Sequence, residues 1–123
     1  MSKGFLKVAE DILKNIDNYS GSQKEFYIRT GISRAYYGLI WQLKERLEKQ
    51  GYNFKGKNIH HFIPKVLADI GKFKEAKKFE ELKTIRNDAD YRYKSEFKKL
   101  KTIDKRTLKT YIKNIHLLIS RIG

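Results

Sequence analysis

Apolar side chains recur at intervals of three and four along most of the chain, which is the spacing that places them on one face of a helix. The pattern predicts helices over residues 3–18, 23–50, 59–70, 72–92 and 103–121. Residues 51–58 contain two glycines and are expected to form a loop, and the charged segment 94–102 is expected to be a connection. No window alternates as a strand does. The sequence therefore predicts an all-α fold, an antiparallel bundle of four to five helices.

The apolar faces of the first, fourth and last predicted helices are the most regular. We expect each face to be buried against the rest of the bundle. Their members are Phe5, Val8, Ala9, Ile12, Leu13 and Ile16; Phe73, Ala76, Phe79, Leu82, Ile85 and Ala89; and Leu108, Tyr111, Ile112, Ile115, Leu118, Ile119 and Ile122.

Short signals mark where the helices should begin and end. Ser22 followed by Glu25 has the spacing of a capping box, which predicts the start of the second helix. Gly51 and Gly71 follow the second and third helices, as capping glycines do. Pro64 is expected near the start of the third helix, where its missing N–H is tolerated.

The length and composition narrow the class of protein. A chain of 123 residues forms one domain, so we expect a single helical domain over 1–123. The sequence has no cysteine, which excludes disulfides, thiol nucleophiles and cysteine zinc sites. Its apolar runs are far shorter than the ~20 residues that span a bilayer, and its first residues lack the apolar block of a signal peptide. We therefore expect a cytoplasmic protein that does not enter a membrane.

Basic residues outnumber acidic ones two to one. The 28 Lys and Arg against 14 Asp and Glu give a formal net charge of +14 and a pI near 9.9. The ion pairs of heat-adapted proteins would raise both signs together, so they leave this excess unexplained. The net charge is zero over residues 1–20 and is highest over the residues after 71. Basic residues are most concentrated over 94–114. Such a run is either a solvated helix face or an edge that contacts phosphates, and nucleic acid is the commonest anionic partner.

The second predicted helix combines small and aromatic residues. Gly31 and Gly38 each cost a helix ~1 kcal/mol relative to alanine, which suggests close approach by another helix, from this chain or a second subunit. Tyr36, Tyr37 and Trp41 follow the same helix. They either pack in the core or stack against bases.

The three histidines do not have the spacing of a metal site. His60 and His61 are adjacent, so on a helix they point about 100° apart and do not face one ion easily. His116 lies among Ile115, Leu117 and Leu118, and we expect it to be packed rather than a ligand. We predict neither a metal nor another cofactor.

A polar cluster ends the fourth predicted helix. Arg86 and Asp90 are four residues apart and can pair on one helical face. Arg86 borders the buried face, where an unpaired cation would be costly, and Asn87 can orient a neighbour. Tyr91 and Tyr93 bring hydroxyls to the same helix end. The cluster is either a surface ion pair beside two packing tyrosines or a site for a phosphate.

Three motifs together give the sequence a resemblance to a known family. They are Arg34-Ala-Tyr-Tyr in the second helix, a histidine near the start of the third, and Arg86-Asn-x-Ala-Asp-Tyr at the end of the fourth. Over roughly residues 5–120 the chain resembles the HEPN superfamily. HEPN domains are small all-α bundles and usually homodimers, and many are metal-independent ribonucleases in toxin–antitoxin, CRISPR and other anti-virus defence systems. The resemblance implies a homodimer with RNA as a partner.

The resemblance also implies roles for individual residues. The HEPN motif is an Arg, often followed by Asn, His or Asp, with a His five residues after the Arg. Arg86 and Asn87 match its first half, whereas Tyr91 stands in the place of the His. Arg86 would hold a phosphate bidentately and Asn87 would orient it. A tyrosine ordinarily has a pKa of about 10, so in this position it is a poor base at neutral pH but can donate a proton or hydrogen bond.

In HEPN toxins paired with minimal nucleotidyltransferases, the motif continues to a tyrosine two residues past the His, and the partner adenylylates it. Tyr93 stands at this position. The resemblance therefore implies that Tyr93 is a modification site and that a nucleotidyltransferase antitoxin or another defence-system subunit is a partner.

Three hypotheses follow. The first is a HEPN-like RNA-binding protein with metal-independent endoribonuclease activity, in which Arg86, Asn87 and Tyr91 act on the RNA. Basic residues of the following segment would attract the RNA, namely Lys94, Lys98, Lys99, Lys101 and Arg106. The second is a non-catalytic adaptor for a nucleotidyltransferase, and the third is a nucleic-acid-binding module without an active site.

Overall fold

The computed structural model describes residues 2–91 and 103–123. They form five α-helices and one short 3-10 helix: α1 (Ser2–Asn15), η1 (Ile16–Asn18), α2 (Gly21–Lys49), α3 (Ile59–Asp69), α4 (Phe73–Tyr91) and α5 (Lys105–Ser120). No strand occurs in these two ranges. The predicted all-α helical bundle is confirmed, and each helix lies within a few residues of its predicted range.

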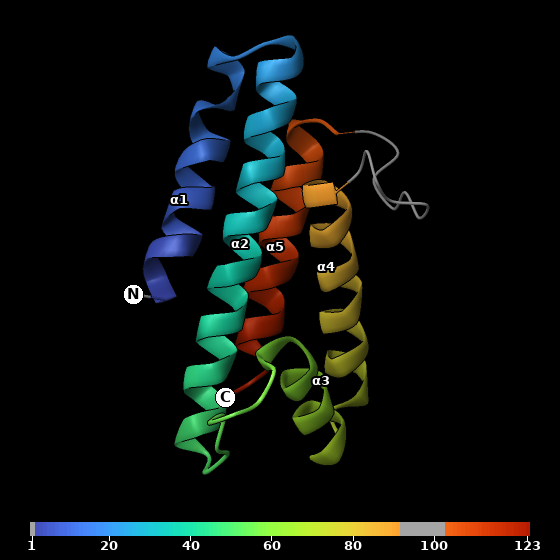
Figure 1. The fold of residues 1–123 in the computed structure, drawn as a ribbon. Coiled ribbons are helices and arrows are strands. Elements are labelled where there is room, and N and C mark those ends of the chain that lie inside the picture. The colour runs from blue at the N-terminus through green and yellow to red at the C-terminus, as the bar shows by residue number, and fades with distance from the viewer. Residues whose placement is uncertain (1, 92–102) are drawn as a thin grey trace.

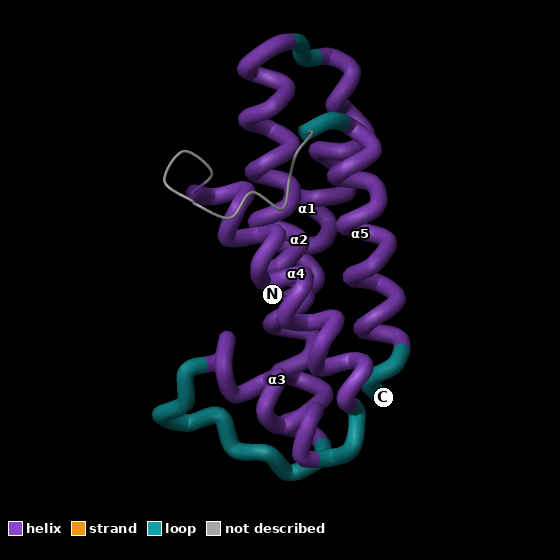
Figure 2. Tube along the Cα trace, turned by 90° about the vertical axis from the view of Figure 1, so that its right-hand side faces the viewer, coloured by secondary structure: helices purple, strands orange, loops and turns teal. Residues whose placement is uncertain are grey.

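The long helix α2 is the axis of the bundle (Figure 1). It packs against α1, α4 and α5, which run alongside it, and the short helix α3 packs against α4 at one end (Figures 1 and 2). Helix α2 runs opposite to α1, α4 runs opposite to α3, and α5 runs opposite to α4 (Figure 1). Helix α3 runs in the same direction as α2, because the loop over 51–58 returns along the bundle before α3 begins. This arrangement brings the middle of α2, the start of α3 and the second half of α4 together.

The core is apolar and is drawn from every helix. Its largest fully buried side chains are Tyr36, Phe79, Ile16, Ile28, Ile32, Leu39, Ile40, Leu43, Leu47, Ile63, Leu67 and Leu82. The predicted apolar faces are correct with two exceptions. Val8 and Phe73 are exposed, Phe73 by 69%. Phe73 is the first residue of α4, so it lies at the end of the bundle rather than between helices.

The start of α2 differs from its prediction. The helix begins at Gly21 with Ser20 as N-cap, and the Ser20 side chain makes no capping hydrogen bond. The capping box predicted at Ser22 is therefore wrong, because Ser22 already lies inside the helix. The end of α2 agrees with its prediction: Gly51 follows Gln50 with φ +100°, which favours glycine.

Gly31 and Gly38 are sites where neighbouring helices approach α2 closely. A Cβ on Gly31 would lie 2.9 Å from Leu108 of α5, and one on Gly38 would lie 3.1 Å from the backbone nitrogen of Leu6 in α1. The predicted close approach is thus made by helices of this same chain. Both glycines hold the bundle at a spacing that a larger residue would disturb.

Pro64 lies deeper in α3 than predicted. It is the sixth residue of the helix rather than one of the first, so it removes an internal hydrogen bond to the carbonyl four residues earlier. That carbonyl belongs to His60, and the ammonium of Lys83 in α4 donates to it over 3.4 Å. The lysine replaces the donor that the proline lacks.

Candidate functional site

Arg86 is the centre of a polar cluster between α4 and α2. Its Nη2 donates to the Tyr37 hydroxyl and its Nη1 to the Asn87 side-chain oxygen, each over 2.9 Å. Its Nε lies 3.0 Å from a carboxylate oxygen of Asp90, which is ion-pair distance, although the N–H is not aligned for a hydrogen bond. The predicted Arg86–Asp90 pair is confirmed. With only 14% of its side chain exposed, Arg86 is held firmly in place.

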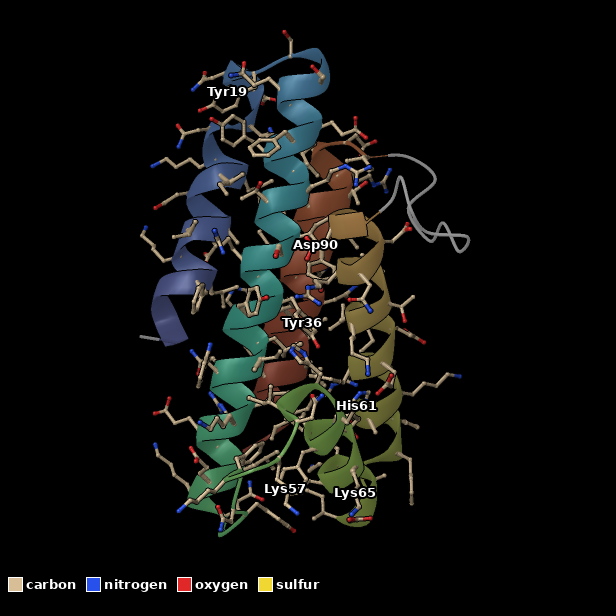
Figure 3. All side chains as sticks on the ribbon, viewed as in Figure 1. Tyr19, Tyr36, Lys57, His61, Lys65 and Asp90 are labelled. Carbon is tan, nitrogen blue, oxygen red and sulfur yellow. The ribbon has the colours of Figure 1, made fainter. Side chains whose placement is uncertain are left out.

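The Arg86 guanidinium lies against two neighbouring tyrosine rings. Its Cζ lies 5.2 Å from the Tyr36 ring centroid and 5.3 Å from that of Tyr37, within the range of cation–π attraction. Tyr36 is fully buried, and burial raises its pKa well above the ordinary value although the Arg86 charge opposes the shift. Tyr36 therefore stays protonated. Figure 3 shows Tyr36 and Asp90 in the region between α2 and α4.

His60 joins the cluster from the first turn of α3. The Asn58 side chain caps this helix by accepting from the His60 backbone N–H over 3.0 Å. The His60 Nδ1 lies 2.9 Å from the Tyr36 hydroxyl, and the two rings are nearly parallel. Burial is the main cause that lowers the His60 pKa, and the charges of Arg86 and Lys83 add to it. The neutral imidazole is thus favoured at neutral pH.

Our candidate site residues did not include His60. Its signal was present in the sequence, since a histidine near the start of the third helix was part of the HEPN resemblance. The adjacent His61 is exposed. No group of three or more His, Asp or Glu side chains in the described ranges has the geometry to hold a metal ion.

Asp90 lies among three arginines. Burial raises its pKa, while Arg86, a hydrogen bond from Ser33, Arg34 and Arg29 lower it. Arg29 also donates to the Ala89 carbonyl over 2.6 Å, which satisfies one of the unpaired carbonyls near the end of α4. The C-terminal end of α4 is therefore bound to α2 by charged groups.

Two pockets flank the Arg86 cluster, and Arg34 lines both. One, of about 390 Å³, lies where α1, α2 and α3 meet and includes Tyr37, Trp41 and His60. The other, of about 380 Å³, lies between α2 and the end of α4 and includes Asp90. The Arg86 cluster thus contributes Tyr37 and His60 to the first pocket and Asp90 to the second.

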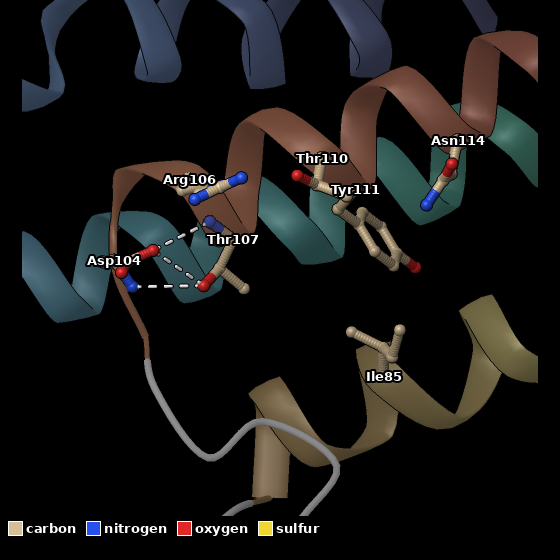
Figure 4. Close-up of a pocket in the computed structure, with 7 residues that line it drawn as sticks. All are labelled: Ile85, Asp104, Arg106, Thr107, Thr110, Tyr111 and Asn114. Carbon is tan, nitrogen blue, oxygen red and sulfur yellow. Dashed lines mark hydrogen bonds between the residues drawn. The ribbon is translucent and has the colours of Figure 1, made fainter.

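Arg106, a predicted RNA contact, lies on another part of the surface. It is exposed in the first turn of α5 and lines a pocket between α4 and α5 (Figure 4). Asp104 caps α5 there: its carboxylate accepts from the Thr107 N–H over 2.9 Å, and the Thr107 hydroxyl accepts in return from the Asp104 N–H over 3.3 Å. At the back of the pocket, Tyr111 donates to the Leu82 carbonyl over 2.8 Å.

The other predicted site residues lie beyond what the structure describes. Tyr91 is the last residue of α4, and its side chain is outside the described part. The predicted modification site Tyr93 and the predicted RNA contacts Lys94, Lys98, Lys99 and Lys101 fall within 92–102, also outside it. Of the three predicted catalytic residues, the structure brings Arg86 and Asn87 together.

The remaining aromatic and histidine predictions have mixed outcomes. Tyr36 packs in the core, whereas Trp41 is 41% exposed, with the Lys44 ammonium 4.8 Å from its ring centroid. The prediction of a packed His116 is wrong. Its side chain is 51% exposed with Nε2 3.7 Å from Glu10, because it projects from α5 beside the buried face rather than within it.

Searches of protein-family models, curated proteins and solved structures gave no significant match to this chain. Among its described helices, none has both the length and the apolar character needed to cross a membrane.

Proposed function

We propose that this protein is a HEPN-like RNA-binding protein and that RNA binds on the face where α2 meets the start of α3 and the end of α4. The observation that carries the proposal is the Arg86 guanidinium, held against two tyrosine rings near the His60 imidazole, whose pKa is lowered. Guanidinium has five N–H donors, and two of them remain after the bonds to Tyr37, Asn87 and the Asp90 pair. Those two suit a phosphate oxygen.

Charge supports the same proposal. Arg34 is exposed and lines both pockets beside the cluster, and Arg29 lines one of them. The chain as a whole carries +14, so a polyanion is attracted to it at long range. Phosphate contacts made by such residues release counterions, which makes the affinity depend steeply on salt.

The test is the fluorescence anisotropy of a labelled single-stranded RNA, titrated with protein at ~50 mM salt and at increasing salt. We expect log affinity to fall linearly with log salt, by about 0.7 per phosphate contacted. Arg34→Ala should weaken binding several-fold and lower this slope by about one contact. Arg121→Ala is the matched control, because Arg121 is also exposed but lies at the far end of α5. Absence of RNA binding at ~50 mM salt would overturn the proposal.

One observation favours RNA cleavage as a second candidate function, and it is His60. In the tautomer whose Nδ1–H donates to the Tyr36 oxygen, Nε2 is free to accept a proton. It would take the proton of a ribose 2′-hydroxyl, whose oxygen then attacks the adjacent phosphorus. The bond from phosphorus to the 5′-oxygen breaks, and that oxygen takes a proton, the role predicted for Tyr91. Arg86 would stabilise the added negative charge on the phosphate.

Cleavage is tested by incubating purified protein with mixed RNA in the presence of EDTA. The His60→Gln variant should bind RNA but not cleave it. The His61→Gln variant, changed at the exposed neighbouring residue, should cleave RNA as the unmodified protein does. Cleavage by the Arg86→Ala variant would come from a contaminant or another site and would contradict the proposed enzymatic activity. Binding without cleavage by any variant would leave an RNA-binding module.

The biological setting we propose, a toxin–antitoxin or anti-virus defence system, rests on the HEPN resemblance. The adaptor hypothesis rests on it as well, with Tyr93 as the residue that a nucleotidyltransferase would modify. A nucleotidyltransferase gene beside the gene for this chain would favour the adaptor. Light scattering of the purified protein tests the homodimer that the resemblance implies.

A further inference from the structure

One face of α2 carries two aromatic residues between two cations. Arg34, Tyr37, Trp41 and Lys44 follow one another at intervals of three, four and three residues, so they lie along one side of the helix. We call these four residues the α2 ladder. Arg34 is exposed, and the Lys44 ammonium lies 4.8 Å from the Trp41 ring centroid. The ladder thus offers ring faces with positive charge at both ends.

Three residues of the ladder, Arg34, Tyr37 and Trp41, line the pocket of about 390 Å³ described above. Phe5 of α1 lies against Tyr37, with ring centroids 5.7 Å apart, and Ile59 and His60 of α3 close the other side. A volume near 390 Å³ is at the lower end of the range for small-molecule sites. Trp41 lines this pocket and is 41% exposed.

The charge of this pocket differs from that of its neighbours. Its lining includes Arg34 and no carboxylate. The pocket beside it includes Asp90, and the pocket between α4 and α5 includes Asp104. An anionic ligand with a flat ring therefore suits this pocket better than either of the other two.

We infer that this pocket holds one unpaired base of the bound RNA, stacked on Trp41, with Arg34 on the adjoining phosphate. The inference rests on the proposed RNA binding and extends it by naming where a base is held. Stacking on an aromatic side chain tolerates any base, because every base has a π face. Binding here would therefore be specific for single strands rather than for one sequence.

Trp41 is the one tryptophan of the chain, so intrinsic tryptophan fluorescence reports on this pocket alone. The experiment titrates the protein with a short unstructured uridine oligomer and with an abasic oligomer of the same length and charge. We expect the uridine oligomer to quench Trp41 in step with the anisotropy of a labelled copy. The abasic oligomer should bind more weakly, by about ten-fold, and should leave the fluorescence nearly unchanged.

Variants separate stacking from charge and from folding. Trp41→Leu should weaken binding of the uridine oligomer by about ten-fold, whereas Trp41→Phe should keep most of the affinity. Phe73→Leu is the matched control, because Phe73 is also an exposed aromatic residue but lies at the start of α4. Circular dichroism on each variant confirms that the helices remain formed.

The outcomes distinguish this inference from the function on which it rests. If labelled RNA binds while Trp41 fluorescence stays constant, the base pocket is wrong and RNA binding stands. If Trp41 fluorescence changes with protein concentration in the absence of RNA, a second copy of the chain occupies the pocket and the inference is overturned. If no RNA binds at ~50 mM salt, the proposed function fails and the base pocket fails with it.

Discussion

Arg86 donates a hydrogen bond of 2.9 Å to the hydroxyl of Tyr37, a residue 49 positions earlier in the chain. The bond joins the second half of α4 to the middle of α2. Because Asn87 accepts from the same guanidinium and Asp90 pairs with it, the bond fixes Arg86 in one orientation. A cation that is held in place before a ligand arrives loses little freedom on binding.

The shape of the Arg86 guanidinium should matter for stability as well as its charge. We expect Arg86→Lys to lower the free energy of unfolding by about 1–3 kcal/mol, because a single ammonium cannot replace the hydrogen bonds to both Tyr37 and Asn87 with the geometry of the planar guanidinium. Urea denaturation measures this. Arg106→Lys, at an exposed position of α5, should change the same quantity by less than about 0.5 kcal/mol. Equal effects of the two substitutions would contradict the prediction.

The lowered pKa of His60 should make stability depend on pH. Burial is the main cause of the lowered pKa. In the folded protein His60 binds a proton only at a lower pH than in the unfolded chain, where it binds one below about pH 6.5. The stability contributed by neutral His60 is therefore complete above that pH and is lost as pH falls toward the folded pKa. Urea denaturation at about pH 7.5 and 5.5 measures the free energy of unfolding. Between these two pH values, His60→Gln should lose less of it than the unmodified protein does.

Two further variants test whether the pH dependence of stability comes from His60. His61→Gln should follow the unmodified protein, since His61 is exposed. Asp90 acts in the opposite sense, because burial raises its pKa above 3.8, so its protonation in the fold adds stability as pH falls toward that value. Asp90→Asn removes this contribution and leaves that of His60. A pH dependence unchanged by His60→Gln would show that His60 is not its source.

A side chain at Gly38 should destabilise the contact between α1 and α2. A Cβ there would lie 3.1 Å from the backbone nitrogen of Leu6, so α1 itself would have to move. We expect Gly38→Ala to destabilise the protein by about 1–2 kcal/mol, since overpacking outweighs the gain in helix propensity. Gly4→Ala is the control: a Cβ at Gly4 has no neighbour within 4 Å, and it should be neutral or stabilising by up to about 1 kcal/mol. Thermal unfolding measures the stability of both variants. A Gly38→Ala variant more stable than the unmodified protein would contradict the prediction.

The stability of the protein should depend on which side chain caps the start of α5 at position 104. Asp104 accepts from the Thr107 N–H, so Asp104→Ala should cost about 0.5–2 kcal/mol of stability. Asp104→Asn keeps an acceptor at the same position and should cost much less. Thermal unfolding of both variants separates the lost hydrogen bond from the lost charge, and equal losses would show that the charge is what stabilises the helix.

The helices could be predicted because their signal is local. Apolar spacing depends only on neighbours in the sequence, so each helix lies within a few residues of its expected range. Single caps were harder to assign. Ser22 and Ser20 are both good N-cap residues, and only the chain direction at Tyr19 and Ser20 decides between them. The cap at Asp104 has threonine as its fourth residue, which is not the usual sequence signature.

The candidate site shows where the sequence ceases to be informative. The Arg86–Asp90 pair was predictable because its members are one turn apart on one helix. Tyr37 and His60 reach the site from other helices, so their roles depend on how α2, α3 and α4 pack. Periodicity shows which face of a helix is buried, but it does not show which residue of another helix lies opposite.

Pro64 has an effect beyond its own helix. By leaving the His60 carbonyl without its usual donor, it gives the Lys83 ammonium an acceptor, over 3.4 Å, on the residue whose ring contacts Tyr36. Lys83 and Arg86 are three residues apart on α4. The carbonyl that the proline leaves open therefore gives α4 a second attachment to the start of α3, one turn from the residue that supplies the guanidinium. A substitution at position 64 would thus change how His60 is held, although Pro64 is not itself a member of the cluster.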